Sequence, residues 1–207
     1  MARSEIGAII LVAGEGTRFR QAAGQDAPPS KLLALYDGKP LVRHVADAAC
    51  SAGLAGVIVV TGHAAKAVRG ALDGLALSFV HNDDYASGMA SSLKLGFGAM
   101  PASWRAACVL LGDMPLVDAE LIGTIADAFQ DNASAVVPVF EGVRGNPVLL
   151  SARLAPDIAQ LTGDAGARHL LRGRADVVEV AVTQAAARLD IDTPEALLHL
   201  KPSSDQA

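Results

Sequence analysis

In Ile6-Gly7-Ala8-Ile9-Ile10-Leu11-Val12-Ala13-Gly14-Glu15-Gly16-Thr17-Arg18, an unbroken apolar run leads into a glycine-rich loop that ends on an arginine. The run Ile6–Val12 predicts a buried strand, of the kind found in parallel sheets. Gly14 and Gly16 let the backbone turn tightly and bring its N–H groups close to an anion. Arg18 offers a bidentate fork to phosphate oxygens. We therefore expect a phosphate-binding loop after the first strand, although the spacings of a P-loop and of a dinucleotide-binding fingerprint are absent.

Short apolar runs alternate with helical patterns along the rest of the chain. The further predicted strands are Gly56–Thr61, Leu77–Val80, Ala106–Leu111, Ala135–Val139, Pro147–Leu150 and Val177–Val182. The predicted helices are Pro40–Ala52, His63–Leu72, Met89–Phe97, Asp118–Phe129, Ala165–Arg172 and Pro194–Leu200. This alternation predicts a single α/β domain over residues 1–207, with three layers (α/β/α), a mostly parallel sheet and a disordered tail at 202–207. Ligands of such sheets bind at the carboxyl ends of the strands.

Composition excludes several classes of function. Apolar residues make up 51% of the chain and charged residues 19%, which is typical of a globular protein. A net charge of -5 argues against a nucleic acid polymer as partner. No apolar stretch has the ~20 residues of a membrane span, and no signal-peptide pattern is present, so we expect a cytoplasmic protein. Cys50 and Cys108 lack metal or redox spacing and are expected to be buried, reduced thiols.

Two further segments place carboxylates where a magnesium ion could be held. Asp113 follows the apolar strand Ala106–Leu111, and Mg²⁺ takes one or two carboxylates together with phosphate oxygens and waters. The alternative role for Asp113 is to cap the next turn. Near the C-terminus, Asp190 and Asp192 alternate and share a face if that segment is extended. Thr193 is a candidate N-cap for the helix that opens at Pro194, and this role is compatible with a metal-binding Asp192.

Taken in order, these motifs resemble those of the molybdenum cofactor nucleotidyltransferases, and most closely those of the cytidylyltransferase branch. The resemblance runs from Ile6 to about Leu198. It rests on the glycine-rich loop with Arg18 and Lys31, and on the following further segments: Asp37–Leu41, Val60–His63, Asn82 with Tyr85–Leu93, Gly112–Pro115, Gly145–Leu149, Gly163–Arg168 and Asp190–Leu197. Each match is weak alone, but their common order carries the assignment. The implied fold is a Rossmann-like sheet of the nucleotide-diphospho-sugar transferase type.

The resemblance implies transfer of a nucleoside monophosphate from an NTP to an acceptor phosphate, with release of pyrophosphate. The residues implied to bind the triphosphate are Ala13, Gly14, Glu15, Gly16, Thr17, Arg18 and Lys31. Those implied to bind the base and ribose are Thr61, Asn82, Gly88, Ser91 and Ser92. Asp113 and Asp192 would bind Mg²⁺ or Mn²⁺, and Gly145, Asn146 and Pro147 would face a pterin acceptor together with the 163–168 loop. Arg18, Lys31 and Asp113 would be catalytic, because the reaction brings anions together and needs cations to neutralise them.

The loop before Lys31 departs from the family. The family commonly has a short step from arginine to lysine, whereas here Arg18-Phe19-Arg20 is followed by Gln21–Ser30 and only then by Lys31. Arg20 is therefore a second candidate for the role of Lys31, and the long loop is a candidate mobile lid. Ala13 stands where cytidylyl members have alanine and guanylyl members tend to have glycine, which favours CTP.

Three hypotheses remain open from the sequence. The first is CMP transfer from CTP to molybdenum cofactor (molybdopterin), with a molybdenum hydroxylase or its maturation factor as a further partner. The second keeps the fold and the chemistry but changes the base to GTP or the acceptor to another phosphorylated compound. The third is a delivery protein that binds molybdenum cofactor without turnover. The presence of both candidate metal carboxylates favours an enzyme.

Overall fold

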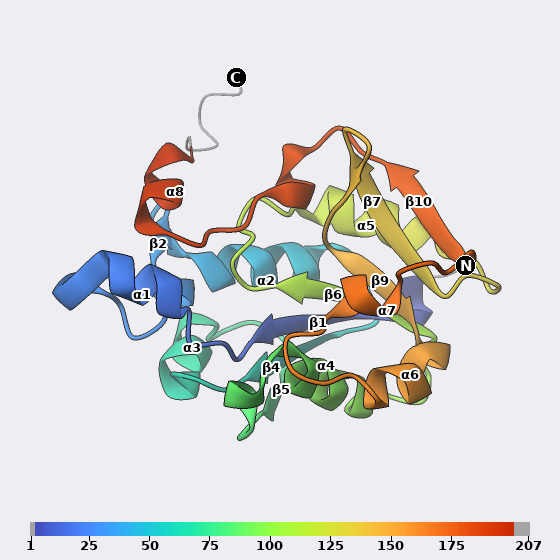
Figure 1. Cartoon of the computed structure of the whole chain (residues 1–207), viewed down its shortest axis with the longest axis horizontal. Coiled ribbons are helices and arrows are strands. Elements are labelled where there is room, and N and C mark those ends of the chain that lie inside the picture. The colour runs from blue at the N-terminus through green and yellow to red at the C-terminus, as the bar shows by residue number, and fades with distance from the viewer. Residues whose placement is uncertain (1–2, 201–207) are drawn as a thin grey trace.

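The computed structural model describes residues 3–200 and has a central sheet between two layers of helices (Figure 1). The strand order is β5 (Ser78–His81), β4 (Val57–Thr61), β1 (Ile6–Val12), β6 (Ala106–Leu111), β9 (Val148–Ser151), β7 (Ala135–Phe140) and β10 (Val177–Ala181), with β8 (Val143–Arg144) paired to β7. The adjacent strands β5, β4, β1 and β6 pair in parallel, and β7 pairs in parallel with β10. Among the described strands of this sheet, only β9 and β8 pair antiparallel with their neighbours. The predicted mostly parallel, three-layer fold is confirmed.

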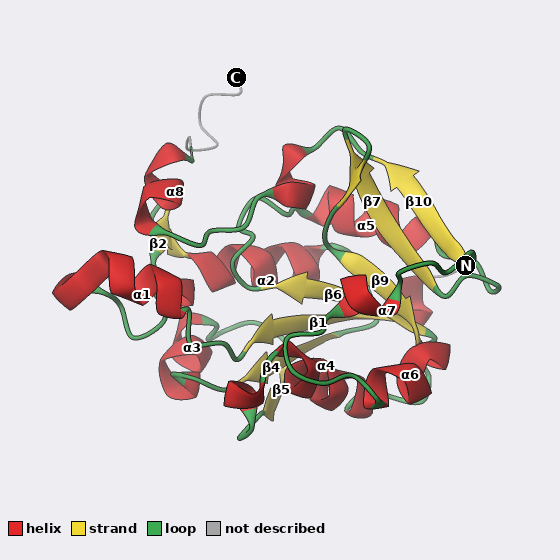
Figure 2. Cartoon of the chain, in the orientation of Figure 1, coloured by secondary structure: helices red, strands yellow, loops and turns green. Residues whose placement is uncertain are grey.

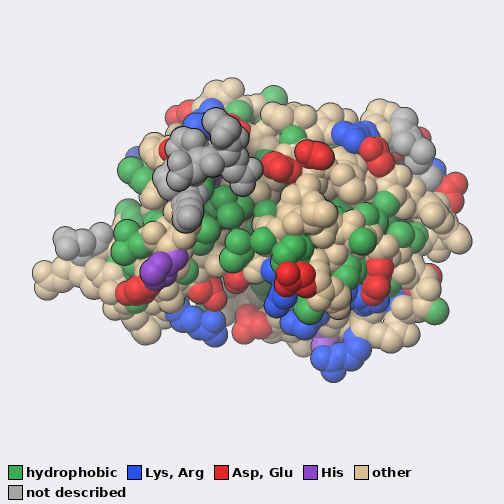
Figure 3. Space-filling view, turned by 90° about the horizontal axis from the view of Figure 1, so that it is seen from above, with side chains coloured by type: hydrophobic (Ala, Val, Ile, Leu, Met, Phe, Trp, Pro, Cys, Tyr) green, Lys and Arg blue, Asp and Glu red, His purple; other side chains and the backbone are tan. Residues whose placement is uncertain are grey.

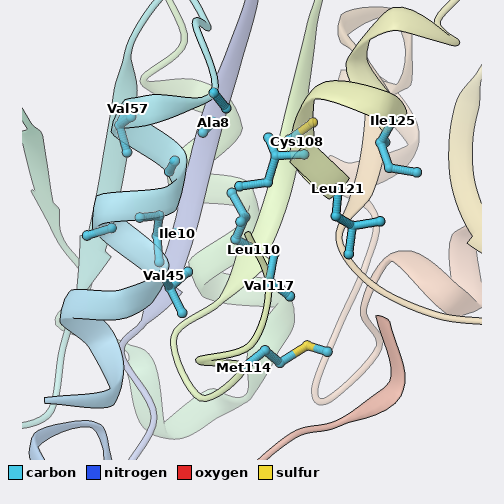
Figure 4. Packing of buried hydrophobic residues seen from close by; sticks show 14 of the residues in the cluster. Ala8, Ile10, Val45, Val57, Cys108, Leu110, Met114, Val117, Leu121 and Ile125 are labelled. Atoms are coloured by element: carbon cyan, nitrogen blue, oxygen red, sulfur yellow. The ribbon is translucent and has the colours of Figure 1, made fainter. Parts of the chain in front are cut away.

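The helices divide between the two faces of the sheet (Figure 2). One core contains side chains of α2 (Leu41–Ser51), α3 (Ala65–Ala71) and α5 (Ala119–Asp127), and the other contains those of α4 (Met89–Gly98) and α6 (Ala155–Ala159) with α7 (Ala167–Leu170) beside it. Along β1, Ala8 and Ile10 face the first core and Ile9 faces the second. Figure 4 shows Ala8 and Ile10 of β1 and Cys108 and Leu110 of β6 among residues of the first core.

The remaining elements are short, and several lie beside the loops of the site. They are α1 (Thr17–Ala23), α8 (Pro194–His199), the hairpin strands β2 (Leu35–Tyr36) and β3 (Lys39–Pro40), and the 3₁₀ turns Arg3–Glu5, Gly24–Asp26, Lys31–Leu33, Tyr85–Ser87, Ala152–Leu154 and Ala185–Arg188. A third, small core joins α1 to the C-terminal segment through Phe19, Tyr36, Leu41 and Ile191. Figure 1 shows α1, β2 and α8 at one end of the molecule.

Several expectations need correction. The segment Gln21–Ser30 is not a plain loop, because its first three residues complete α1 and the next three form a 3₁₀ turn. Pro40 is the N-cap of α2 and pairs in β3, so the helix begins one residue later than predicted. Cys108 is buried as expected, but Cys50 is exposed, since it lies on the outer side of α2.

The parallel strands deliver their following loops to one edge of the sheet, since β1, β4, β5 and β6 all run the same way. This brings together residues that follow Val12, Thr61, His81 and Leu111. The predicted tail 202–207 lies outside the described residues. Within residues 3–200, none of the helices has the length and apolar character that a membrane crossing requires.

Candidate active site

A pocket of about 480 Å³ opens at the carboxyl ends of β1 and β6. The glycine-rich loop, the start of α4 and the loop after β6 form its walls, and its lining residues are Leu11, Val12, Gly14, Glu15, Gly16, Thr17, Lys31, Leu32, Tyr85, Ala86, Gly88, Met89, Ser92, Leu111, Gly112, Asp113 and Asp164. The phosphate-binding loop predicted from the sequence therefore lines the same pocket as the predicted metal ligand Asp113. Tyr85, Met89 and Asp164 line it as well, although they were noted in the sequence only as parts of motifs.

Gly16 shapes the entry to this pocket. Its φ of 61° lies in the left-handed region, which favours glycine. A Cβ atom at this position would lie 2.8 Å from Cγ of Lys31, so the Lys31 stem packs directly against the loop backbone. The glycine thus allows a lysine fifteen positions later in the sequence to lie against the loop.

Lys31 lies between the two predicted metal carboxylates. Its Nζ is 2.6 Å from Oδ2 of Asp113 and 3.0 Å from Oδ1 of Asp192. The side chains of Lys31 and Asp113 are only 13% and 16% exposed, whereas that of Asp192 is 45% exposed. Arg18 is further from Asp192, at 3.4 Å, and its side chain is 84% exposed. Lys31, and not Arg18, is therefore the cation at the centre of the site.

The same contacts shift the pKa values of the site. Burial is the largest influence on the pKa of Lys31 and acts to lower it, but Asp113 and Asp192 together outweigh burial, so the pKa of Lys31 is raised. The hydrogen bond from Lys31 is the main cause that lowers the pKa of Asp192, against a smaller opposing effect of burial. Both shifts favour an ion pair at neutral pH.

Local structure fixes the carboxylates in this position. The backbone N–H of Ile191 donates to the carbonyl oxygen of Asp113 at 3.0 Å, which joins the C-terminal segment to the end of β6. Ile191 is 1% exposed in the small third core, so its neighbours Asp190 and Asp192 point away from that core. Thr193 accepts a hydrogen bond from the N–H of Ala196 at 3.2 Å and caps α8, as predicted.

Asp113 has an unmet bonding capacity. Its Oδ1 is buried and has no hydrogen-bond partner among the described residues, while Oδ2 pairs with Lys31. Neither oxygen caps a turn within this part of the chain, so the alternative role for Asp113 is not supported. A buried carboxylate oxygen without a donor is costly, and a metal ion would satisfy it.

The residues present fit a magnesium or manganese ion whose other ligands come from the substrate. No group of three or more His, Cys, Asp or Glu side chains within residues 3–200 could hold a metal alone. One or two carboxylates are the usual protein contribution to Mg²⁺ sites that also bind phosphates. The pocket lining holds one lysine against the carboxylates of Glu15, Asp113 and Asp164, so a triphosphate there needs added positive charge.

Of the residues predicted to bind the base and ribose, some line the pocket and others are buried. Gly88 and Ser92 line the pocket, but Thr61 and Asn82 are 0% and 1% exposed. The Asn82 amide donates to Oγ of Ser91 at 2.8 Å and to Oγ of Ser92 at 2.9 Å. Thr61 donates to the carbonyl oxygen of Val80 at 3.2 Å. In this arrangement Asn82 positions the serines of α4.

The other predicted site residues lie around the pocket. Ala13 is buried beneath the loop, at 3% exposure. Gly145 and Asn146 line two neighbouring pockets, and the Asn146–Pro147 peptide bond is cis. Arg20 Nη1 lies 3.5 Å from Nε2 of His63, which is itself 3.0 Å from the carbonyl oxygen of Pro29. Arg20 thus lies with the long segment before Lys31 and contacts neither Asp113 nor Asp192.

The chain is similar to several known proteins. A family model described as "MobA-like NTP transferase domain" matches residues 8–180. Nicotine blue oxidoreductase of Paenarthrobacter nicotinovorans is 28% identical over 200 residues, which is 93% of this chain and 94% of that protein. Molybdenum cofactor cytidylyltransferase of Escherichia coli (strain K12) is 32% identical over 127 residues, which is 60% of this chain and 62% of that protein.

Among solved structures, that of Rv0371c from Mycobacterium tuberculosis H37Rv matches with a TM-score of 0.77 and 28% identity, covering 93% of this chain and 95% of that one. The same protein has also been crystallised in complex with manganese, and that structure matches with a TM-score of 0.75. The fold is that of the nucleotide-diphospho-sugar transferases, as the sequence motifs implied.

Proposed function

This chain belongs to the MobA-like NTP transferase family, and on that premise we propose that it transfers CMP from CTP to molybdenum cofactor and releases pyrophosphate. The observation that carries the proposal is Lys31 held between Asp113 and Asp192, with Lys31 and Asp113 lining the same pocket as the glycine-rich loop. The E. coli relative named as a molybdenum cofactor cytidylyltransferase supports the choice of CTP and acceptor. Ala13 beneath the loop supports CTP further, by the family pattern.

In the proposed reaction, an acceptor phosphate oxygen attacks the α-phosphorus of CTP and the bond to the β-phosphate oxygen breaks. The backbone of Gly14–Thr17 binds the triphosphate, while Asn82 holds Ser91 and Ser92 in place. Asp113 and Asp192 would hold Mg²⁺ or Mn²⁺, which supplies charge neutralisation to the reacting phosphates. A metal ion bound to both carboxylates would need the position that Lys31 Nζ occupies. We therefore expect Lys31 to move away from the carboxylates and bind the departing pyrophosphate.

The proposal is tested by pyrophosphate release. Purified protein is incubated with each NTP in turn, Mg²⁺ or Mn²⁺, and molybdenum cofactor. Release with CTP and not with the other nucleotides is the expected result. Asp113→Asn is expected to lower turnover at least about a hundredfold, because a metal ion contributes several kcal/mol to such reactions. Asp73→Asn is the matched control, since Asp73 is exposed and lines none of these pockets. Equal activity in the two variants would refute the metal assignment.

Other outcomes select the remaining hypotheses. Release with GTP or with another phosphorylated acceptor would keep the reaction and change the substrate. Tight binding of molybdenum cofactor with no release for any NTP would indicate a delivery protein. Reduction of a dye by NADH or NADPH would indicate an oxidoreductase, which the name of the P. nicotinovorans relative makes worth testing.

The proposal also includes the cellular location of the protein and the protein that receives its product. A cytoplasmic protein that passes its product to a molybdenum hydroxylase or its maturation factor remains a prediction. It is tested by fractionating cells and by capturing the hydroxylase on the immobilised protein in the presence of the product.

A further inference from the structure

The pocket at the glycine-rich loop continues into two further pockets. The second, of about 280 Å³, shares Leu11, Met89, Leu111 and Asp164 with the first. The third, of about 210 Å³, shares Leu111, Arg144, Gly145, Asn146 and Arg168 with the second. The three pockets therefore form one cleft along the carboxyl edge of the sheet.

The charge of the walls reverses along this cleft. The first pocket is lined by one lysine and three acidic residues, whereas the third is lined by Arg144, Arg168 and Arg188 with Asp190 as the one acidic residue. The chain as a whole has a net charge of -5, so a concentration of arginines runs against its composition. In Figure 3, acidic and basic side chains are interspersed over the face shown. An arginine-lined pocket is thus a local feature that calls for an anion.

The walls between the two charged ends are mainly apolar. Leu93, Val109, Val137, Val148 and Leu171 line the second pocket. They suit the body of a ligand that is flat or apolar, and the polar groups needed for orientation lie at the two ends.

The arginines are held at the third pocket by backbone contacts. The N–H of Asn146 donates to the carbonyl oxygen of Ala187 at 2.8 Å, and a Cβ atom on Gly145 would collide with that same carbonyl. This close approach brings the residues beside Arg144 against those beside Arg188. Arg168 lines the same pocket from α7.

Two of these guanidinium groups are available to a ligand. The side chains of Arg168 and Arg188, which line this pocket, have no hydrogen-bond or ion-pair partner in the described range 3–200. Arg144 donates through Nε to Glu179 at 2.7 Å, which leaves its terminal nitrogens without a described partner. Free arginines that line a pocket beside an apolar channel are suited to bidentate recognition of an oxyanion.

We propose that Arg144, Arg168 and Arg188 bind a second oxyanionic group of the acceptor, at the end opposite its reacting phosphate. The acceptor class is then a phosphorylated compound with an apolar or flat body and a second oxyanion, such as a phosphate, a carboxylate or a molybdenum-oxo group. This inference rests on the proposed function, because it assumes that the reacting phosphate lies at Asp113.

The test uses inorganic molybdate and inorganic phosphate as probes, without nucleotide or divalent metal. Binding is measured by calorimetry for the wild type, for Arg168→Gln, for Arg188→Gln and for the double variant. We expect each single variant to bind the probes at least tenfold more weakly, which is ~1.4 kcal/mol. Arg172→Gln is the matched control, since Arg172 is an exposed arginine one turn beyond Arg168 and lines none of these pockets. Unchanged binding in the double variant, with native melting temperatures, would overturn the inference.

A kinetic measurement separates this inference from the proposed function. If the enzyme releases pyrophosphate from CTP, the arginine variants should raise KM for the acceptor at least tenfold and leave KM for CTP unchanged. An unaltered acceptor KM would overturn the arginine site while leaving the proposed function intact. If CTP does not bind to the wild type at all, the proposed function fails, and probe binding still decides whether the arginine site exists.

Discussion

At the residue scale, Lys31 is the side chain on which the site depends. It fills the space between Asp113 and Asp192, the same carboxylates that are expected to hold the metal ion. A lysine and a divalent cation cannot both occupy that space, so they compete for the same oxygens. The ion pair keeps the partly buried Asp113 neutralised when no metal is bound.

Replacement of Lys31 by methionine tests this competition. Lys31→Met should tighten Mn²⁺ binding, measured by calorimetry without nucleotide, because the ion no longer displaces an ammonium group. In the presence of a metal chelator, the free energy of unfolding of the variant should be roughly 3 kcal/mol lower than that of the wild type, since Asp113 becomes a buried charge without a partner. Added Mn²⁺ should restore that loss.

Lys39→Met is the control for this experiment. Lys39 is an exposed lysine paired with Asp47, away from the pocket. It should change neither Mn²⁺ affinity nor the response to chelator. Weaker Mn²⁺ binding in Lys31→Met would show that the lysine assists the metal and would contradict the competition.

The two cysteines give a second prediction at this scale. Burial raises the pKa of Cys108 to about 12, while Cys50 is exposed on α2 with a pKa that is raised less. A thiol reagent at pH 8 should therefore modify one thiol in the native protein and a second only after unfolding. Cys50→Ser should abolish the first reaction, and rapid modification of the native Cys50→Ser variant would contradict the burial of Cys108.

At the scale of elements, the segment before α8 positions Asp192. Ile191 anchors it in the small core with Phe19 of α1, and Thr193 caps the helix that follows. These two contacts lie on either side of Asp192 in the sequence. The position of Asp192, the second carboxylate proposed to bind the metal, therefore depends on a helix of only six residues.

Loss of the cap should affect both stability and the site. Thr193→Ala should cost about 1 kcal/mol of unfolding free energy, measured in urea. It should also raise KM for CTP, because a loosened α8 lets Asp192 move away from Lys31. Thr193→Ser keeps the hydroxyl oxygen and should behave like the wild type. Equal KM values for the Ala and Ser variants would contradict the link between α8 and Asp192.

At the scale of the whole molecule, ion pairs tie distant parts of the chain together. Arg3 pairs with Asp127 at 2.6 Å, and Lys31 pairs with Asp192. In each case the hydrogen bond from the basic partner is the main cause that lowers the pKa of the aspartate. Such carboxylates bind protons more readily in the unfolded chain than in the folded one.

This sets the direction of the acid response. The pKa values of Asp127 and Asp192 are lowered in the folded protein. Their contribution to the free energy of unfolding is therefore complete above the ordinary pKa of 3.8 and is lost as the pH falls through the lowered pKa values. The urea midpoint should be nearly constant from pH 7 to pH 5 and fall below pH 4. Asp127→Asn should reduce that fall. An unchanged acid response in this variant would mean that the Arg3 pair contributes nothing.

Much of the fold followed from local pattern. The apolar runs before Ala13 and before Gly112 predicted β1 and β6 at their observed positions, and their parallel pairing follows from the alternation of strands and helices. The segment after Arg20 was less predictable, because α1 continues to Ala23 and packs into the small core through Phe19 and Ala23. Periodicity cannot show such packing.

For the site, the sequence by itself determined the chemical parts: a glycine-rich loop, a lysine, two carboxylates and their order along the chain. Only the tertiary structure decided that Lys31 lies between Asp113 and Asp192 and that Arg144, Arg168 and Arg188 line one pocket. The reason is physical. Local propensity acts over a few residues, whereas these groups meet because the parallel sheet brings the ends of distant strands to one edge and long-range packing fixes what lies there.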